Sequence, residues 1–208
     1  MPGRRSVEPR VACGVTHATP LPARGGAAAE GTAETGGGAR RMRKARVFWP
    51  LLLGLLVADC GSKRIAEESL VLHSPREVVG DVVRFTLAYN PGAAFGIDVG
   101  PASRVVFTTL TLIALLALLL MYRSTPADRR VQLVALALIT GGALGNLLDR
   151  LRGAAGVVDF IDVGVGSTRW WTFNLADAGI TVGAILLALT LWTEPEAGGE
   201  RVETAIPE

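Results

Sequence analysis

Five aspartates lie inside or directly beside long apolar segments of this 208-residue chain: Asp59, Asp149, Asp159, Asp162 and Asp177. An ionised carboxylate in the hydrocarbon core of a bilayer costs about 2.5–3.5 kcal/mol on insertion scales, so such groups normally face a partner or water. The simplest interpretation of each is a helix-end residue in the headgroup region, solvated or paired with arginine. Asp149 fits this interpretation because Arg150 follows it, and Asp162 is expected to be exposed in a loop.

Asp159 and Asp177 have surroundings that point to chemistry. Asp159 has two apolar residues on each side and no adjacent cation. Asp177 lies inside the last apolar segment, and Asn174 shares its helical face at i−3, as Asn146 does for Asp149. Two carboxylates held close together share one proton, so one stays protonated while the other activates water. Hydrolysis is therefore predicted, and ion or proton translocation and structural pairing remain open alternatives.

Four apolar segments are long enough, or nearly long enough, to position these acids in a membrane. They cover residues 47–58, 105–122, 131–148 and 170–193. The first is short for a hydrocarbon core about 30 Å thick, so its helix must continue past Asp59 toward Ala66. Basic clusters precede the first segment and fill the loop between the second and third, which predicts cytoplasmic N- and C-termini and places 64–104 and 149–169 outside.

Composition removes several other classes of function. Half of the residues are hydrophobic, only 19% are charged, and the net charge is +2, so a nucleic-acid partner is not expected. Two cysteines and two histidines far apart predict neither a disulfide framework nor a metal site. The run ending in Asp59-Cys60 is similar to a lipoprotein signal, but Asp59 stands where such signals need a small residue.

The remaining segments are assigned by pattern. Residues 1–44 are rich in Gly, Ala, Pro and Arg and are expected to be a disordered extension, with Met42 as an alternative start. Residues 194–208 are expected to be a disordered acidic tail. Alternation from Val83 to Tyr89 predicts a half-buried strand that ends at an Asn90-Pro91-Gly92 turn, within a small β region around 67–100.

Four motifs occur in order along the chain. They are Asn90-Pro91-Gly92-Ala93-Ala94-Phe95-Gly96, the run Gly141-Gly142-Ala143-Leu144-Gly145-Asn146-Leu147-Leu148-Asp149-Arg150, Val157-Val158-Asp159-Phe160 and Phe173-Asn174-Leu175-Ala176-Asp177. Together they resemble the N-x-G-A-A-F-G/S, G-G-A-x-G-N-x-x-D-R, V-x-D-F-like and F-N-x-A-D elements of the lipoprotein signal peptidase (signal peptidase II) family. The resemblance covers roughly residues 45–193. It departs from the family at Pro91, Cys60 and the N-terminal extension.

The resemblance implies a membrane protein, mainly α, with four transmembrane helices in a peptidase domain over 45–193 and a small extracytoplasmic β-cradle. It implies an aspartic endopeptidase that removes the signal peptide from diacylglyceryl-modified prolipoproteins just N-terminal to the lipidated cysteine. Asp159 and Asp177 are then the catalytic pair. The residues expected to bind substrate or order the site are Asp59, Asn90, Gly142, Asn146, Arg150 and Asn174. Asp59 with Lys63 is similar to the family's D-x-x-x-K element.

The same resemblance implies a multi-pass protein of the bacterial inner membrane, acting as a monomer on its lipidated substrate among membrane lipids, with no metal or cofactor. Its active site would lie near the extracytoplasmic surface. The transport alternative requires acids spread through the depth of the bilayer. Both candidate acids are instead predicted at one surface, which favours hydrolysis.

Overall fold

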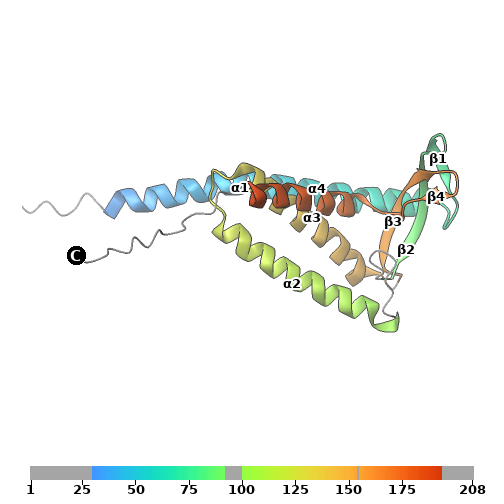
Figure 1. The fold of residues 1–208 in the computed structure, drawn as a ribbon. Coiled ribbons are helices and arrows are strands. Elements are labelled where there is room, and N and C mark those ends of the chain that lie inside the picture. The colour runs from blue at the N-terminus through green and yellow to red at the C-terminus, as the bar shows by residue number, and fades with distance from the viewer. Residues whose placement is uncertain (1–29, 92–99, 154, 194–208) are drawn as a thin grey trace, which may run out of the picture.

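The computed structural model describes residues 30–91, 100–153 and 155–193, and it is mainly helical (Figure 1). The long helices are α1 (Glu30–Ser69), α2 (Ser103–Ser124), α3 (Arg130–Arg152) and α4 (Leu175–Trp192). Each contains a stretch long and apolar enough to cross a membrane, and in α1 that stretch is Arg40–Ser69. Mainly helical architecture with four candidate spans and a small antiparallel sheet confirms the predicted fold class.

Two helix ends differ from the sequence-based expectation. α1 is already helical at Glu30, within the part of the chain predicted to be disordered, and alanine, glutamate and arginine in residues 30–46 favour a helix. It continues past Asp59 to Ser69, as its length requirement predicted. α4 begins at Leu175 and not at residue 170, because Asn174 has an extended backbone and caps the helix. Residues 1–29 and the expected acidic tail at 194–208 lie outside the described residues.

α3 is the central helix of the bundle. Just over half of its apolar stretch, 56%, is buried, against 17% or less in the other three helices. It packs against α1, α2 and α4, while α2 diverges from α1 and α4 toward its N-terminal end (Figure 1). Close packing on two sides needs small residues, and Gly141 lies against the α1 backbone at Leu52 while Gly142 lies against α4 at Ala176.

A four-stranded antiparallel sheet lies at one end of the bundle (Figure 1). Its strands, in spatial order, are β1 (Arg76–Val79), β2 (Val83–Asn90), β3 (Val157–Val165) and β4 (Thr168–Arg169). β2 matches the strand predicted from alternation. Half of the sheet, however, comes from residues 157–169, outside the β region expected around 67–100. The Gly92–Gly96 part of the first motif lies outside the described residues.

An ion cluster holds the far end of this sheet together. The Arg169 guanidinium donates to Asp162 Oδ1 at 2.9 Å and to the Asp81 backbone oxygen at 2.5 Å, and Thr86 donates to Asp162 Oδ2 at 3.2 Å. Asp162 is therefore buried and paired, and the expectation that it is exposed in a loop is wrong. The reason is that residues 157–165 form a strand that pairs with β4, and this pairing places Arg169 beside Asp162.

Candidate active site

Asp159 and Asp177 are joined by the side chains of two asparagines. Asn174 Nδ2 donates to Asp159 Oδ1 at 2.7 Å, and Asn146 Nδ2 donates to Asp177 Oδ1 at 2.8 Å. The two amides also meet, since Asn174 Nδ2 lies 3.2 Å from Asn146 Oδ1. The order Asp159, Asn174, Asn146, Asp177 is thus a continuous hydrogen-bonded chain that connects β3, α4 and α3.

Asn174 has two roles in this arrangement. It is fully buried, and it forms a capping box in which its Oδ1 accepts from the Asp177 backbone N–H at 2.9 Å while Asp177 Oδ2 accepts from the Asn174 backbone N–H at 3.3 Å. Its side-chain nitrogen remains for Asp159 and the neighbouring Val158 carbonyl. The residue that starts α4 therefore also fixes both acids relative to the helix.

Asp159 is held in an apolar part of β3. It faces Ala88 of β2 in the sheet register, lies between the buried residues Val158 and Phe160, and is 4% exposed. Burial, and next the nearby Asp177 charge, raise the pKa of Asp159 to about 7, while hydrogen bonds from Asn174 and Asn90 act in the opposite direction. A carboxyl with such a pKa can hold or release a proton near neutrality.

Asn90 and Arg150 lie next to this pair. Asn90, the last residue of β2, makes a side-chain hydrogen bond to Asp159. Arg150 Nη1 donates to the Asn146 backbone oxygen at 3.4 Å, and Arg150 is close enough to interact electrostatically with both acids. Its Nε is buried with no hydrogen-bond partner among the described residues.

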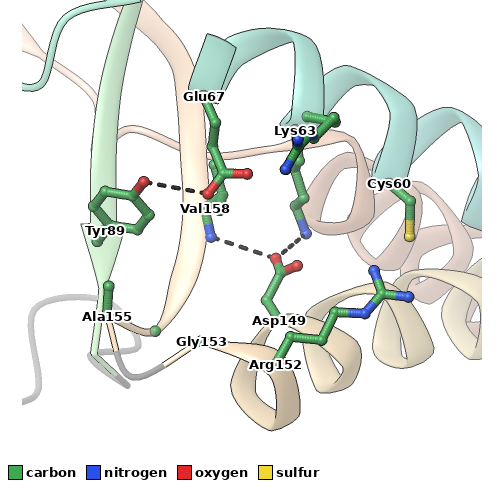
Figure 2. A pocket seen from close by; sticks show the side chains of 11 residues that line it. Cys60, Lys63, Glu67, Tyr89, Asp149, Arg152, Gly153, Ala155 and Val158 are labelled. Carbon is green, nitrogen blue, oxygen red and sulfur yellow. Dashed lines mark hydrogen bonds and ion pairs between the residues drawn. The ribbon is translucent and has the colours of Figure 1, made fainter.

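Asp149 has a different cation from the one expected. Its Oδ2 lies 2.8 Å from Lys63 Nζ, and the same oxygen accepts from the Val158 backbone N–H at 3.3 Å (Figure 2). Among the described residues no Asp149–Arg150 ion pair is present, so the pairing suggested by their adjacency is wrong. Lys63 lies in the C-terminal turns of α1, 86 positions before Asp149. In the sequence, only its place in the D-x-x-x-K element indicated that it has a role at the site.

Asp59 and Gly142 are both part of the packing between helices, and neither presents a polar group to the cavity. Asp59 is fully buried, forms an ion pair with Lys63 at 2.8 Å and accepts from the Ala176 backbone N–H at 2.9 Å. α3 and α4 approach closely at Gly142, because a β-carbon there would meet the Ala176 backbone oxygen and, at 2.8 Å, Ile180 Cγ1. Both residues therefore act on the position of Asp177, one residue after Ala176.

Both acids line an open cavity of about 950 Å³. Asn90, Asn146 and Arg150 complete its polar end, and its remaining lining is largely apolar, with Trp170, Trp171, Phe173, Ile180 and Val182. Trp170 and Trp171 precede α4, are mostly exposed and stack edge to face, so they form a cavity wall outside the helix that they were predicted to begin. In the described part of the chain no group of three His, Cys, Asp or Glu residues is placed to hold a metal ion.

Comparison with known protein sequences matches this chain to one family. The family model described as signal peptidase (SPase) II matches residues 51–193. The lipoprotein signal peptidase of Moorella thermoacetica is 41% identical over 143 residues, which are 68% of this chain and 91% of that protein. That of Ectopseudomonas mendocina is 40% identical over 160 residues, 74% and 94% of the two chains.

Two solved structures of bacterial membrane enzymes have a similar fold. A bacterial membrane enzyme determined by the in meso method at 2.3 Å resolution superposes with a TM-score of 0.63 and 29% identity, covering 73% of this chain and 90% of that chain. A second, at 1.9 Å resolution, gives 0.62 and 31%, with coverage of 70% and 92%.

These matches define first a class, the membrane-embedded peptidases of the aspartic type. Within that class, the chain belongs to the signal peptidase II family. Members of that family cleave signal peptides from prolipoproteins, and four candidate spans agree with a place in the bacterial inner membrane.

Proposed function

We propose that this enzyme cleaves diacylglyceryl-modified prolipoproteins just N-terminal to the lipidated cysteine, with Asp159 and Asp177 as its catalytic dyad. The observation that carries the proposal is the hydrogen-bonded chain of two asparagines that joins the two acids at the polar end of a largely apolar cavity. Such a cavity suits a substrate whose scissile bond lies beside a lipid chain. The protein acts without a resident metal or cofactor.

The reaction needs one ionised and one protonated carboxyl. We assign the resting proton to Asp159, because burial and the nearby Asp177 favour its neutral form. Asp177 removes a proton from water as the water oxygen attacks the scissile carbonyl carbon, and Asp159 gives its proton to the carbonyl oxygen. When the tetrahedral intermediate collapses, the C–N bond breaks, Asp177 gives its proton to the leaving nitrogen, and Asp159 takes a proton back from a hydroxyl of the intermediate, so that Asp159 again carries the single proton of the pair.

The other polar residues position the pair and the substrate. Asn174 and Asn146 keep N–H donors on the two carboxylates, and Asn90 adds a donor to Asp159 from the opposite strand. Arg150 places a positive charge at the polar end of the cavity, where it favours ionisation of the dyad and can bind a carbonyl or ester oxygen of the substrate. The apolar wall then receives the diacylglyceryl chains.

We also propose the orientation of the enzyme. The sheet and the two acids lie at one end of the bundle, and the basic residues of 40–46 lie toward the opposite end of α1 (Figure 1). Basic residues beside a span favour the cytoplasmic side, so the dyad faces the extracytoplasmic surface. This is the side where a lipidated cysteine would emerge from the membrane after translocation.

The proposal is tested by giving the purified protein a diacylglyceryl-modified prolipoprotein and its unlipidated twin. Cleavage of the lipidated form alone, with a new N-terminus at the modified cysteine by mass spectrometry, is the expected result. Equal cleavage of both forms would refute the need for the lipid. Absence of cleavage of either form by folded protein would refute the proposed substrate.

A further inference from the structure

Lys63 is a buried cation with three close oxygen partners, one hydrogen-bonded amide and two paired carboxylates. It is 2% exposed, and Nζ lies 2.8 Å from Asp59 Oδ2, 2.8 Å from Asp149 Oδ2 and 2.9 Å from Asn146 Oδ1. An ammonium group has three N–H donors, and three acceptors surround this one. The acceptors come from α1 and α3, so one charge joins the two helices directly below the sheet.

The two carboxylates on Lys63 have matching second contacts. Asp59 accepts from the backbone N–H of Ala176, at 2.9 Å, and Asp149 accepts from the backbone N–H of Val158, at 3.3 Å. Ala176 directly precedes Asp177, and Val158 directly precedes Asp159. Each carboxylate therefore joins the same ammonium to the peptide group next to one member of the dyad. In Figure 2 the Lys63–Asp149–Val158 half of this arrangement is visible as two consecutive dashed lines.

The third contact of Lys63 sets the orientation of an amide. An ammonium can approach only the oxygen end of a carboxamide, so Asn146 must present Oδ1 to Lys63 and Nδ2 to the other side. Nδ2 is the atom that donates to Asp177 at 2.8 Å. Without the ammonium, Oδ1 would keep only its 3.2 Å contact with Asn174 Nδ2, and a reversed amide would put an oxygen against the Asp177 carboxylate.

The surrounding glycine leaves space for this unit. A β-carbon at position 145 of α3 would collide with Asp59 Oδ2, so only glycine lets the buried carboxylate lie against α3 and reach Lys63. Burial strengthens the two ion pairs, and together with the hydrogen bond to Asn146 they offset the cost of removing the ammonium from water.

We infer that Lys63, together with Asp59 and Asp149, is a positioning unit that sets the separation of the two dyad carboxylates and the donor that faces Asp177. This inference rests on the proposed function, since it gives the dyad its geometry. Lys63 itself is not among the residues lining the catalytic cavity and faces a separate cavity of about 360 Å³ on the other side, so it is a positioning residue and not a catalytic one.

The inference has an electrostatic consequence that a purely structural role does not have. The Lys63 charge lowers the pKa of Asp159, which burial and Asp177 otherwise raise. Replacing Lys63 with methionine, of similar length and without charge, leaves Asp59 and Asp149 uncompensated. The alkaline limb of the kcat profile, where the general acid loses its proton, should then move to higher pH.

The test compares K63M and D149N with wild-type enzyme on the lipidated prolipoprotein, and measures kcat, KM and the pH profile. Asn at position 149 retains an oxygen for the Val158 N–H and loses only the charge that holds Lys63. We expect kcat to fall about 30-fold or more in K63M, and by a smaller factor in D149N, because displacement of reacting groups by about 1 Å costs on the order of 100-fold. KM should stay within about threefold in both, and only K63M should move the alkaline limb upward.

R152Q and R64Q are the matched controls. Both arginines line the same 360 Å³ cavity as Lys63 and contact neither dyad acid, so both variants should retain wild-type kcat and pH profile. Thermal unfolding in detergent establishes that each variant is folded. If K63M does not fold, the kcat of D149N tests the positioning role on its own.

Wild-type kcat and an unmoved limb in folded K63M, or wild-type kcat in folded D149N, would overturn the positioning role. Folded wild-type enzyme that does not cleave the substrate would instead overturn the proposed function and with it this role.

Discussion

Replacing Gly142 with alanine should slow cleavage much more than it weakens the fold. The β-carbon would enter the contact between α3 and α4, where it meets the backbone oxygen of Ala176 and lies 2.8 Å from Ile180 Cγ1. A backbone oxygen cannot rotate away as a side chain can, so α4 must move outward. Asp177 follows Ala176 directly and would move with it, away from Asn146 and from Asp159.

The two effects have different magnitudes. Overpacking a tight contact costs about 1–3 kcal/mol, and exchanging glycine for alanine in a helix returns about 1 kcal/mol, so the net loss of stability is about 0–2 kcal/mol. The required shift of α4 is on the order of 1 Å, and misplacing a reacting group by that much lowers the rate on the order of 100-fold. G142A should therefore remain folded with kcat near 1% of wild type.

The assay measures kcat on the lipidated prolipoprotein and thermal unfolding in the same detergent. G61A is the control, because a β-carbon at Gly61 of α1 has nothing within 4 Å; it should keep full activity and be as stable as wild type or slightly more stable. Wild-type kcat in folded G142A would show that close approach of α3 and α4 does not set the position of Asp177, and would refute the reasoning.

Three further outcomes are expected. D159N and D177N should each abolish cleavage while inserting and folding normally, and a variant with normal turnover would remove that residue from the dyad. Because the pKa of Asp159 in the folded protein is raised to about 7, the folded protein binds more protons at this residue than the unfolded chain does between about pH 4 and 7. Thermal stability should therefore fall as the pH rises through that window. D159N should make stability depend less on pH, and an unchanged slope would contradict the assigned cause. In a background without native cysteines, an impermeant thiol reagent added outside the cell should label S167C, in the exposed β3–β4 turn, and not S124C at the C-terminal end of α2; the reverse pattern would invert the proposed orientation.

Local sequence patterns predicted the helices and strands better than they predicted which side chains contact one another. The four spans and strand β2 follow from hydropathy and alternation, which are properties of neighbouring residues, and the fold class they predicted is confirmed. The unusual apolar surroundings of Asp159 and Asp177 were equally visible in the sequence, and the structure brings both into one hydrogen-bonded chain with Asn146 and Asn174.

The partners of buried charges were not predictable in this way. Adjacency suggested Arg150 for Asp149, whereas the cation that reaches it is Lys63, from a helix far away in the chain. Asp162 was expected in water. It instead binds Arg169 across the β3–β4 pair and accepts a hydrogen bond from Thr86 of β2, 76 positions earlier. Such contacts depend on how helices and strands pack, and no periodicity in the sequence specifies which distant residues will meet.

The double role of Asn174 has a consequence for the newly made protein. The residue that starts the last helix is also the amide that connects the two acids, and Asp177 lies three positions further on. A nascent chain that ends before α4 contains Asp159 and its partner Asn90, but it lacks both Asn174 and Asp177. With Asp159 and Asp177 as the proposed dyad, peptide-bond hydrolysis cannot begin until the final helix has formed, and a partly synthesised chain cannot cut other proteins at the site of membrane insertion.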